Sequence, residues 1–398
     1  MIDAGEDPVQ KKAEQKAELT REKLLVKDVW KAFLKYHKRQ WSDVHYNDTL
    51  YYSRAATDTK EAGILWPLME KRMIDIDAAA LVQWAETATR EHKNKFKAVQ
   101  TQRKINLQEA ERLERSAKRA SAKGNNRQAE KDLKEAAKLR TQKLSNIKGN
   151  NTALRQGYKR FRAFWNWAVQ REEYRGLNSS AMFQHSDLTR LLPPMKPKSD
   201  SLEKAQLKSW FEAVQKIENP QISAYLQILL LTGARRNELA ALKWEDVDFK
   251  WKSIWIKDKV EDKRQIPLTP YVEFLLSRLP DSDTWVFSSP TSKKTGHITE
   301  PRLAHKRALL VAGLPDDLSL HGLRRSFSTL SEWLEMPVGI VAQIMGHKPS
   351  ATAEKHYKRR PLELLAKSHT TFENWILEQA EIQFNAKAVK EGLHVAEE

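Results

Sequence analysis

Residues 231–244, LTGARRNELAALKW, place two adjacent arginines directly behind an apolar run. Residues 228–231 are all apolar and predict the end of a buried helix, which a Thr-Gly pair interrupts. Glycine permits a tight backbone turn there, so Arg235 should emerge at the rim of a core in a fixed orientation. Such a guanidinium suits bidentate contact with a phosphate or a carboxylate. Glu238 follows three residues later, and alone the motif fits a structural arginine–glutamate pair better than a ligand site.

The chain is strongly basic. Its 398 residues contain 69 Lys and Arg against 52 Asp and Glu, a formal net charge of +17. This length suffices for two or three domains. The charge favours nucleic acid as the partner, and the alternative is a basic protein whose lysines are merely scattered over its surface. The absence of cysteine excludes disulfides, cysteine–zinc sites and thiol nucleophiles, and it fits a cytoplasmic protein. No run of 18 apolar residues predicts a membrane span, and the charged first residues lack a signal core.

Helical periodicity dominates the first half of the chain. Residues 1–20 are polar and are expected to be exposed, whereas residues 21–183 are expected to form a helical domain. The helices predicted within that domain, apart from those of residues 101–150, cover about 24–41, 49–66, 77–100 and 152–174. Aromatic and basic residues are mixed in the last of these, and its aromatics are expected to be core rather than platforms for stacked bases.

Residues 101–150 differ in composition from the rest of the first half. They contain 14 Lys and Arg and 6 Asp and Glu, a net charge of +8, and their apolar residues are mostly Ala and Leu in a thin stripe. The sequence GNN at 124–126 interrupts the stripe, which predicts a helical hairpin with two arms of about 20–30 residues, on the order of 30–45 Å long. A solvated hairpin without a ligand is the alternative to a DNA-contacting one.

The proline-containing stretch 184–200 is the best candidate for a domain linker. After it, residues 201–370 predict a second, mostly helical domain. Residues 251–270 begin with alternating apolar and polar residues and predict a small strand pair. Residues 371–398 predict an amphipathic tail helix. The expected fold class is therefore mainly α with a small antiparallel β-sheet.

Four short motifs in the second half complete a set with Arg235. KVEDKRQIP places Lys259 in the predicted strand pair, and LHGLRRSF places His321 and Arg324 three apart on one helix face. IVAQIMGH ends a short helix at a glycine that His347 follows, and KPSATAEKHYKRR carries a tyrosine at position 357 on the next predicted helix.

In this order and spacing the motifs resemble the tyrosine recombinases of the phage and genomic-island integrase family. Their signature is Arg in T-G-x-R-x-x-E-L, Lys on a β-hairpin, H-x-L-R, G-H and then Tyr about ten residues later. Each piece is common alone, but the ordered set is specific. The resemblance covers about residues 200–370 and implies six catalytic residues: Arg235, Lys259, His321, Arg324, His347 and Tyr357.

The resemblance also implies the chemistry. Tyr357 would be the nucleophile toward a DNA phosphodiester, although only about 0.1% of a tyrosine with a pKa near 10 is phenolate at neutral pH. The two arginines and two histidines would stabilise the charge that develops on the phosphate oxygens, so no metal and no cofactor is expected. Lys259 would protonate the leaving 5′-oxygen, with Lys257 and Lys263 as rivals for that role.

Domain roles and partners follow from the same resemblance. Residues 21–183 would be a core-binding domain, with the hairpin near 101–150 as an insertion, and together with residues 201–370 would clamp double-stranded DNA in a C shape. Residues 1–20 resemble the tail of a missing arm-binding domain. A tetramer on two DNA sites is expected, with an excisionase or DNA-bending protein as accessory partner. The tail helix would dock on a neighbouring protomer or on its own domain. The alternatives to a recombinase are relaxation of DNA like that of a type IB topoisomerase, and DNA binding without catalysis.

Overall fold

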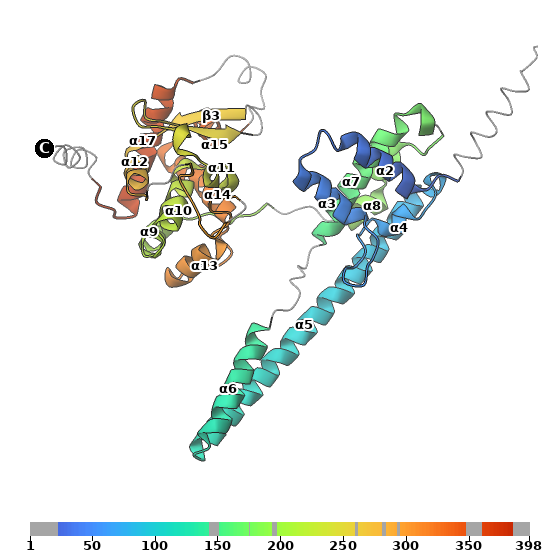
Figure 1. Ribbon diagram of the computed structural model, residues 1–398, viewed down its shortest axis with the longest axis horizontal. Helices are drawn as coiled ribbons and strands as arrows, with labels where there is room; N and C mark the ends of the chain where they lie inside the picture. The colour runs from blue at the N-terminus through green and yellow to red at the C-terminus, as the bar shows by residue number, and fades with distance from the viewer. Residues whose placement is uncertain are drawn as a thin grey trace, which may run out of the picture. The chain divides into compact units, whose positions relative to one another are not determined.

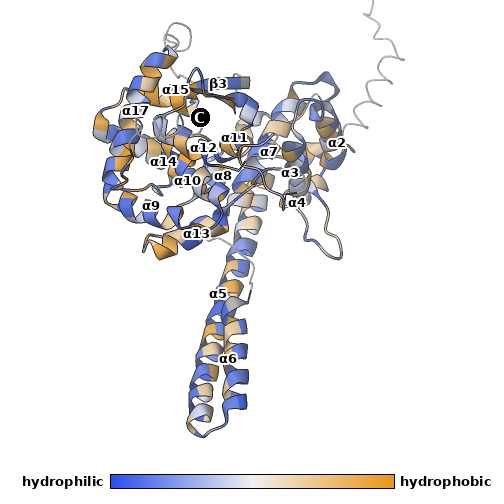
Figure 2. Ribbon diagram, turned by 60° about the vertical axis from the view of Figure 1, so that its left-hand side comes forward, coloured by the Kyte–Doolittle hydropathy of each residue, from blue (hydrophilic) through white to orange (hydrophobic). Residues whose placement is uncertain are grey.

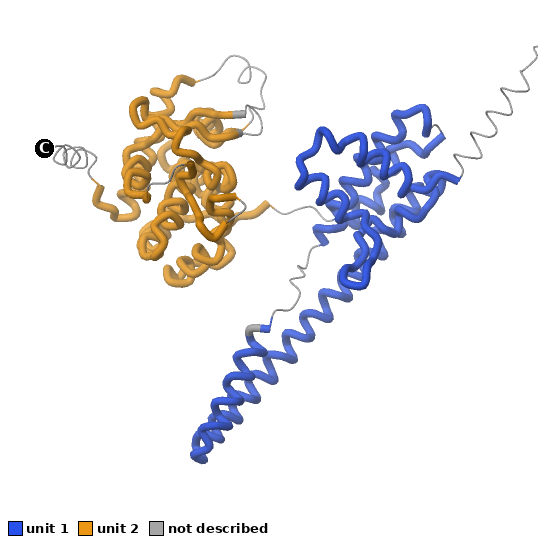
Figure 3. The backbone as a smooth tube through the Cα atoms, viewed as in Figure 1, with its two compact units in different colours: residues 1–196 blue, residues 197–398 orange. Residues whose placement is uncertain are grey.

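The computed structural model describes residues 23–142, 151–174, 176–192, 197–258, 262–280, 284–292, 295–347 and 360–384. The chain divides into two compact units, Met1–Lys196 (unit 1) and Pro197–Glu398 (unit 2), which Figure 3 distinguishes by colour. Both units are mostly helical, and unit 2 contains a three-stranded antiparallel sheet, which confirms the predicted fold class. Among the described residues, none of the helices is both long and apolar enough to cross a membrane.

Aromatic side chains fill the core of unit 1. The predicted first helix is α2 (Val26–His37), and its buried Trp30 packs against Phe164 of α7 (Thr152–Val169) with ring centroids 5.0 Å apart. Phe164 and its neighbour Trp165 are both fully buried. The aromatics of this segment therefore stabilise the fold of unit 1, as expected, because burial of such rings contributes on the order of 2–3 kcal/mol each.

The predicted helix over 49–66 is wrong. The structure has α3 (Asp43–Ser53) and the short α4 (Trp66–Met69), separated by a loop. The loop is closed by the backbone, since the Gly63 amide donates to the carbonyl of Arg54 at 2.9 Å. A Cβ at Gly63 would lie 2.3 Å from the carbonyl oxygen of Tyr52, so the chain folds back at a place where only glycine fits.

The predicted charged hairpin is present, and its first arm is longer than expected. It consists of α5 (Ala78–Ala122, 45 residues) and α6 (Asn126–Thr141, 16 residues), joined at Gly124, whose φ is +75°. No boundary falls near residue 101, because α5 runs without interruption from the compact part of unit 1 to the turn (Figure 1). At about 1.5 Å per residue α5 is about 68 Å long.

Polar side chains join the two arms. The Asn106 amide donates to Gln142 at 2.7 Å, and Arg140 donates to Glu114 at 2.8 Å. Between these contacts and the turn, alanines of both helices form the thin seam that the sequence predicted. Hydrophilic residues recur along the whole length of both helices (Figure 2).

The predicted linker is partly structured. The helix α8 (Ser186–Leu191) lies within residues 184–200, and its Leu188 is fully buried in unit 1. His185 caps this helix, since its ring accepts a hydrogen bond from the Asp187 amide at 3.4 Å. The prolines therefore follow a short helix that belongs to unit 1, and the two units part only after Lys196.

Unit 2 is built around α10 (Pro220–Thr232), which contains the apolar run that precedes the two arginines and is buried on nearly all sides. Against it pack α14 (Leu320–Ser331) and other helices of the unit. Within the described residues of unit 2, the other helices of eight or more residues are α9 (Leu207–Gln215), α12 (Pro270–Ser277), α13 (Arg302–Val311), α15 (Val338–Met345) and α17 (Leu362–Gln379).

The sheet has the order β1-β2-β3, with strands Val247–Asp248, Ser253–Asp258 and Asp262–Pro267. Ile254 of β2 lies opposite Ile266 of β3, and Ile256 lies opposite Arg264. Directly opposed residues share one face of a sheet, so this register places Arg264 among the isoleucines on the buried face.

Of the tail helix predicted over residues 371–398, the part up to Gln379 forms the second half of α17, and residues 385–398 lie outside the described ranges. Phe372 and Ile376 are fully buried in the core of unit 2, and the ring of Phe372 lies 4.8 Å from that of Phe327. Glu373 accepts hydrogen bonds from the backbone amides of Tyr271 and Val272, at the start of α12. This segment was expected to pack either on a neighbouring protomer or on its own domain. The buried residues named here pack on their own unit.

Candidate active site

The turn after α10 fixes Arg235. Gly233 ends the helix with φ of +59°, and a Cβ there would lie 2.8 Å from the ring of Phe327. Both the left-handed backbone and the close ring therefore require glycine at this position. Arg235 is then the N-cap of α11 (Arg236–Ala240). Its Nη1 donates to Glu238 Oε1 at 2.7 Å, and its amide donates to Glu238 Oε2 at 3.3 Å. The guanidinium keeps 34% of its side-chain surface exposed, at the rim of the core as expected.

The C-terminus of α15 lies beside this turn. Gly346 ends the helix with φ of +71°, and the His347 amide donates to the carbonyl of Ala342 at 2.9 Å. The last carbonyls of a helix lack intrahelical partners and carry the negative end of its dipole, so cations are favoured there. Three consecutive carbonyls accept from three arginines: Ile344 from Arg264 Nε at 3.2 Å, Met345 from Arg324 Nη1 at 2.8 Å and Gly346 from Arg235 Nη2 at 2.9 Å.

Arg324 joins the ends of two helices. Its Nη1 also donates to the carbonyl of Gly233 at 2.6 Å, and only 3% of the residue is exposed. A buried guanidinium is tolerated when carbonyls satisfy its donors. Arg324 therefore holds the glycine turn before Arg235 against the helix end that precedes His347.

The two predicted histidines face the same arginines. Desolvation lowers the pKa of His321, and the charges of Arg325 and Arg324 lower it further. Desolvation also lowers the pKa of His347, with added repulsion from Arg324 and Arg235. Both residues are exposed. In the protein without a bound anion, both side chains are therefore neutral at pH 7.

A close backbone approach orients the helix that carries His321. A Cβ at Gly322 would lie 2.5 Å from the carbonyl oxygen of Asp200. The Asp200 carboxylate accepts from the hydroxyl of Ser319 at 2.7 Å and from its amide at 3.2 Å, and it also pairs with Arg325. The glycine between the predicted histidine and arginine thus lets the start of unit 2 cap α14.

Sequence reasoning missed Arg264. Its Nη2 donates to Glu238 Oε2 at 3.0 Å, and the side chains of the two residues are 7% and 10% exposed. Glu238 therefore accepts from Arg264 and Arg235 together. The sequence does contain a signal for this residue. The alternation along the hairpin that makes Ile254 and Ile266 core residues also places Arg264 on the inner face of the hairpin.

Three lysines are candidates for the general acid that protonates the leaving 5′-oxygen. Lys257 lies opposite Lys263 on the β2–β3 hairpin, and Lys263 Nζ pairs with the buried Asp246 at 2.6 Å. Lys259 and Tyr357 lie outside the described residues. Within the described part of the chain, no group of three or more His, Asp or Glu side chains is arranged to hold a metal ion. Of the six predicted site residues, the structure brings four together: Arg235, His321, Arg324 and His347.

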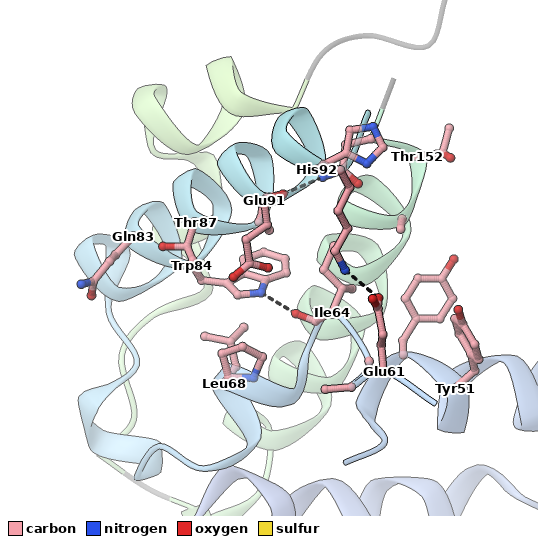
Figure 4. A pocket seen from close by; sticks show the side chains of 18 of the residues that line it. Tyr51, Glu61, Ile64, Leu68, Gln83, Trp84, Thr87, Glu91, His92 and Thr152 are labelled. Carbon is pink, nitrogen blue, oxygen red and sulfur yellow. Dashed lines mark hydrogen bonds and ion pairs between the residues drawn. The ribbon is translucent and has the colours of Figure 1, made fainter. Parts of the chain in front are cut away.

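A cavity of about 970 Å³ lies in unit 1, apart from these residues (Figure 4). Trp84 Nε1 donates to the carbonyl of Ile64 at 2.7 Å in its wall, and Lys95 pairs with Glu61 at 2.6 Å. Its lining contains none of the six predicted site residues, and it reaches Asn151, which follows residues outside the described ranges.

Matches to known protein families define a class, the tyrosine recombinases. Residues 200–361 match the family model described as the phage integrase family, and residues 25–105 match the phage integrase core-binding domain. The chain therefore belongs to the phage integrase family of tyrosine recombinases.

Two curated relatives show the extent of the similarity. The chain is 55% identical to prophage integrase IntF of Escherichia coli (strain K12) over 239 residues, 58% of this chain and 51% of IntF. It is 27% identical to tyrosine recombinase XerC of Pediococcus pentosaceus over 184 residues, 41% of this chain and 60% of XerC. The chain thus spans about half the length of the curated relatives it matches.

Two solved structures share the fold. The Tn1549 transposon integrase, solved with circular intermediate DNA, matches with a TM-score of 0.52 and 15% identity, over 85% of this chain and 97% of that one. The lambda integrase tetramer bound to a Holliday junction matches with a TM-score of 0.52 and 10% identity, over 91% of this chain and 86% of that one.

Proposed function

We propose that this protein is a site-specific DNA recombinase that integrates or excises mobile DNA through a 3′-phosphotyrosine intermediate. The observation that carries the proposal is the meeting of four residues at the end of α15. Arg235 and Arg324 bind consecutive carbonyls there, and desolvation and the charges of both arginines lower the pKa of His321 and of His347. Four donor groups around one position suit an anion with several oxygens, such as a phosphodiester.

In the first step the hydroxyl oxygen of Tyr357 attacks phosphorus. The bond from phosphorus to the deoxyribose 5′-oxygen breaks, and a bond to the tyrosine oxygen forms. The tyrosine loses its proton, and the 5′-oxygen gains one, so the step is balanced without an oxidant or a nucleotide cofactor. The intermediate keeps a phosphodiester, so a 5′-hydroxyl of another strand can reverse the chemistry and release the tyrosine.

Arg235 and Arg324 stabilise the charge that grows on the non-bridging oxygens. Their carbonyl and carboxylate contacts hold them before the substrate binds, so little reorganisation accompanies the reaction. His321 and His347 are neutral without an anion, so each can donate one N–H to the phosphate or exchange a proton with the reacting groups.

Lys259 supplies the proton to the leaving 5′-oxygen. The alkoxide of a deoxyribose is a poor leaving group, so a general acid at this position contributes strongly. The pairing of Lys263 with the buried Asp246 supports Lys259 over this rival, because an ion pair at 2.6 Å holds the Lys263 Nζ on a carboxylate of its own unit.

The partner is double-stranded DNA, which unit 1 (with the core-binding match) and unit 2 grip from two sides as a clamp. The +17 charge supports a grip held mainly by phosphate contacts. Strand exchange would use a tetramer on two DNA sites. The solved lambda integrase structure, a tetramer bound to a Holliday junction, supports this assembly. An excisionase or a DNA-bending protein assists, and the reaction takes place in the cytoplasm of a bacterial cell.

The test uses a duplex with the junction sequence from beside the encoding gene, nicked close to the cleavage position. After cleavage the short fragment diffuses away, so the protein remains covalently attached to DNA. Tyr357→Phe should abolish the adduct and leave binding nearly intact, because it removes only the nucleophilic oxygen. Equal adduct from this variant would contradict the assignment, relaxation without exchange between two sites would indicate a topoisomerase, and binding with no adduct from the parent would indicate loss of catalysis.

A further inference from the structure

The long helix α5 carries a one-sided stripe of positive charge. At about 100° per residue, seven basic residues fall within an arc of about 100° on this helix. All seven are exposed, and we name them the α5 stripe: Arg90, Lys93, Lys97, Lys104, Arg115, Lys118 and Arg119.

The opposite side of α5 carries its buried residues, which lie in the first turns and in the half that pairs with α6. Leu81, Trp84 and Ala85 pack into the compact part of unit 1, and Ala110 and Ala117 pack against α6. These residues lie in an arc centred about 160° away from the α5 stripe. The stripe therefore faces away from both the compact part of unit 1 and the second arm.

The acidic residues of the hairpin compensate only a small part of the stripe's charge. Glu114 pairs with Arg140 of α6, and Glu109 pairs with Arg112, outside the stripe. Glu111 is the one acidic residue within the arc between Arg90 and Arg119, a stretch that is described throughout. The seven stripe side chains make no salt bridge with another residue of the described ranges, so their charge is available to an external anion.

The stripe has a spacing that matches duplex DNA. Its members form a proximal cluster (Arg90, Lys93, Lys97) and a distal cluster (Arg115, Lys118, Arg119), whose centres are 24 residues apart. On a helix this is about 36 Å. One turn of B-form DNA is about 34–36 Å, so a helix along the duplex axis would meet the same strand at both clusters. Lys104 lies about 16 Å from the proximal centre, where the opposite strand crosses that face.

From this geometry we propose that the α5 stripe is a second DNA-binding surface, which lies along the duplex and contacts its phosphates one helical turn apart. The proposal rests on the proposed function, because a recombinase must hold DNA beyond its cleavage site. It assigns the hairpin a phosphate-binding face on α5 and none on the outer face of α6. Sequence-independent contacts are expected, since lysine and arginine bind phosphates without reading bases.

The experiment compares two triple variants of the full chain on a random-sequence 40-base-pair duplex. Arg115→Gln, Lys118→Gln and Arg119→Gln together remove the distal cluster. The matched control, Arg127→Gln, Lys131→Gln and Lys134→Gln, removes the same charge from the outer face of α6 at the same end of the hairpin. Circular dichroism checks that both variants keep their helices. Affinity is measured at several salt concentrations.

The distal variant should bind more weakly, and its slope of log affinity against log salt should be shallower by about 2.7, three contacts at about 0.9 each. The control should keep the parent's slope. Equal losses in both variants would show that the hairpin attracts DNA without a preferred face, which overturns the proposal. Unchanged slopes in both would show that the hairpin does not touch DNA, and an acidic protein surface would become the better ligand.

These outcomes are independent of cleavage. Normal covalent capture by the distal variant together with an unchanged salt slope would refute the α5 stripe alone. A shallower slope together with no adduct from the parent protein would refute the recombinase function alone, and leave the α5 stripe as a DNA-binding surface.

Discussion

Arg264 donates to Glu238 at 3.0 Å inside unit 2, and the same carboxylate receives Arg235 on its other oxygen at 2.7 Å. One largely covered acid thus pairs with a buried arginine and orients an arginine at the rim. Removal of one partner of a buried ion pair leaves the other charge unpaired, which costs on the order of 3–5 kcal/mol. The position of Arg235 therefore depends on a residue of the β2–β3 hairpin that the predicted catalytic set does not include.

Arg264→Met should lower the thermal stability of unit 2 and reduce the rate of covalent capture. The loss of stability should stay below the roughly 3–5 kcal/mol that an unpaired buried charge costs, since Glu238 keeps Arg235 as a partner. Arg264→Lys should recover part of the stability and less of the rate. The planar guanidinium of arginine donates to Glu238 and to the carbonyl of Ile344 at once, and the compact ammonium of lysine cannot. The exposed Arg278→Ala is the control and should change neither quantity. Parent-like capture by Arg264→Met would exclude the orienting role.

The local sequence predicts the turns of the site better than the contacts between them. Gly233 and Gly346 end their helices as expected, because a glycine behind an apolar run signals a left-handed cap without distant information. The carbonyls that Arg235 and Arg324 bind lie elsewhere along the chain, so no local pattern announces them. The same limit explains the wrong helix near Gly63, where a close backbone approach decides the ending.

Arg235→Ala and Arg324→Ala should each slow cleavage about 10²–10³-fold, by analogy with the loss of one oxyanion donor. The two variants should differ in stability. Arg324 is buried and joins two helix ends, so its removal should also lower the melting temperature, whereas Arg235 is one-third exposed. Cleavage by the parent should proceed in a chelator, and a strict magnesium requirement would contradict the mechanism.

Lys259→Ala should be rescued by a DNA substrate with a 5′-bridging phosphorothiolate. A sulfur leaving group departs without a proton, so a missing general acid no longer limits the rate. The measurement is the ratio of cleavage rates on the sulfur and oxygen substrates for Lys259→Ala, Lys257→Ala and Lys263→Ala. Rescue of one of the latter two would reassign the general acid, and rescue of none would remove the lysine from this role.

His321 and His347 should change their titration when DNA binds. In the free protein, desolvation and the neighbouring arginines hold the pKa of each below its usual value. A phosphate between these groups offsets the positive charge, so the pKa of each histidine should rise on binding and protons should be taken up. NMR titration of the ring signals with and without a duplex measures this, using Tyr357→Phe to prevent cleavage. Identical titration curves would place the phosphate elsewhere.

The stability of unit 2 should depend on pH through three buried groups. Burial lowers the pKa of His305 and of His369 to about 4, and it raises the pKa of Glu373 to about 7. Each histidine binds protons less well in the fold than in the unfolded chain, so its contribution is present above about pH 6.5 and is lost toward pH 4. Glu373 binds its proton better in the fold, so its contribution grows as pH falls from 7 to 4.5 and partly offsets this loss.

The offset predicts opposite changes in two variants. Between pH 6.5 and 4.5 the parent loses stability with a slope of about one proton from these groups, or about 1.4 kcal/mol per pH unit. Glu373→Gln removes the compensating carboxyl, so its melting temperature should fall more steeply than the parent's as pH is lowered. His369→Gln removes one of the two losses and should melt with a flatter pH dependence. If the melting temperatures of both variants run parallel to the parent's across this range, neither buried group titrates in the window that its burial implies.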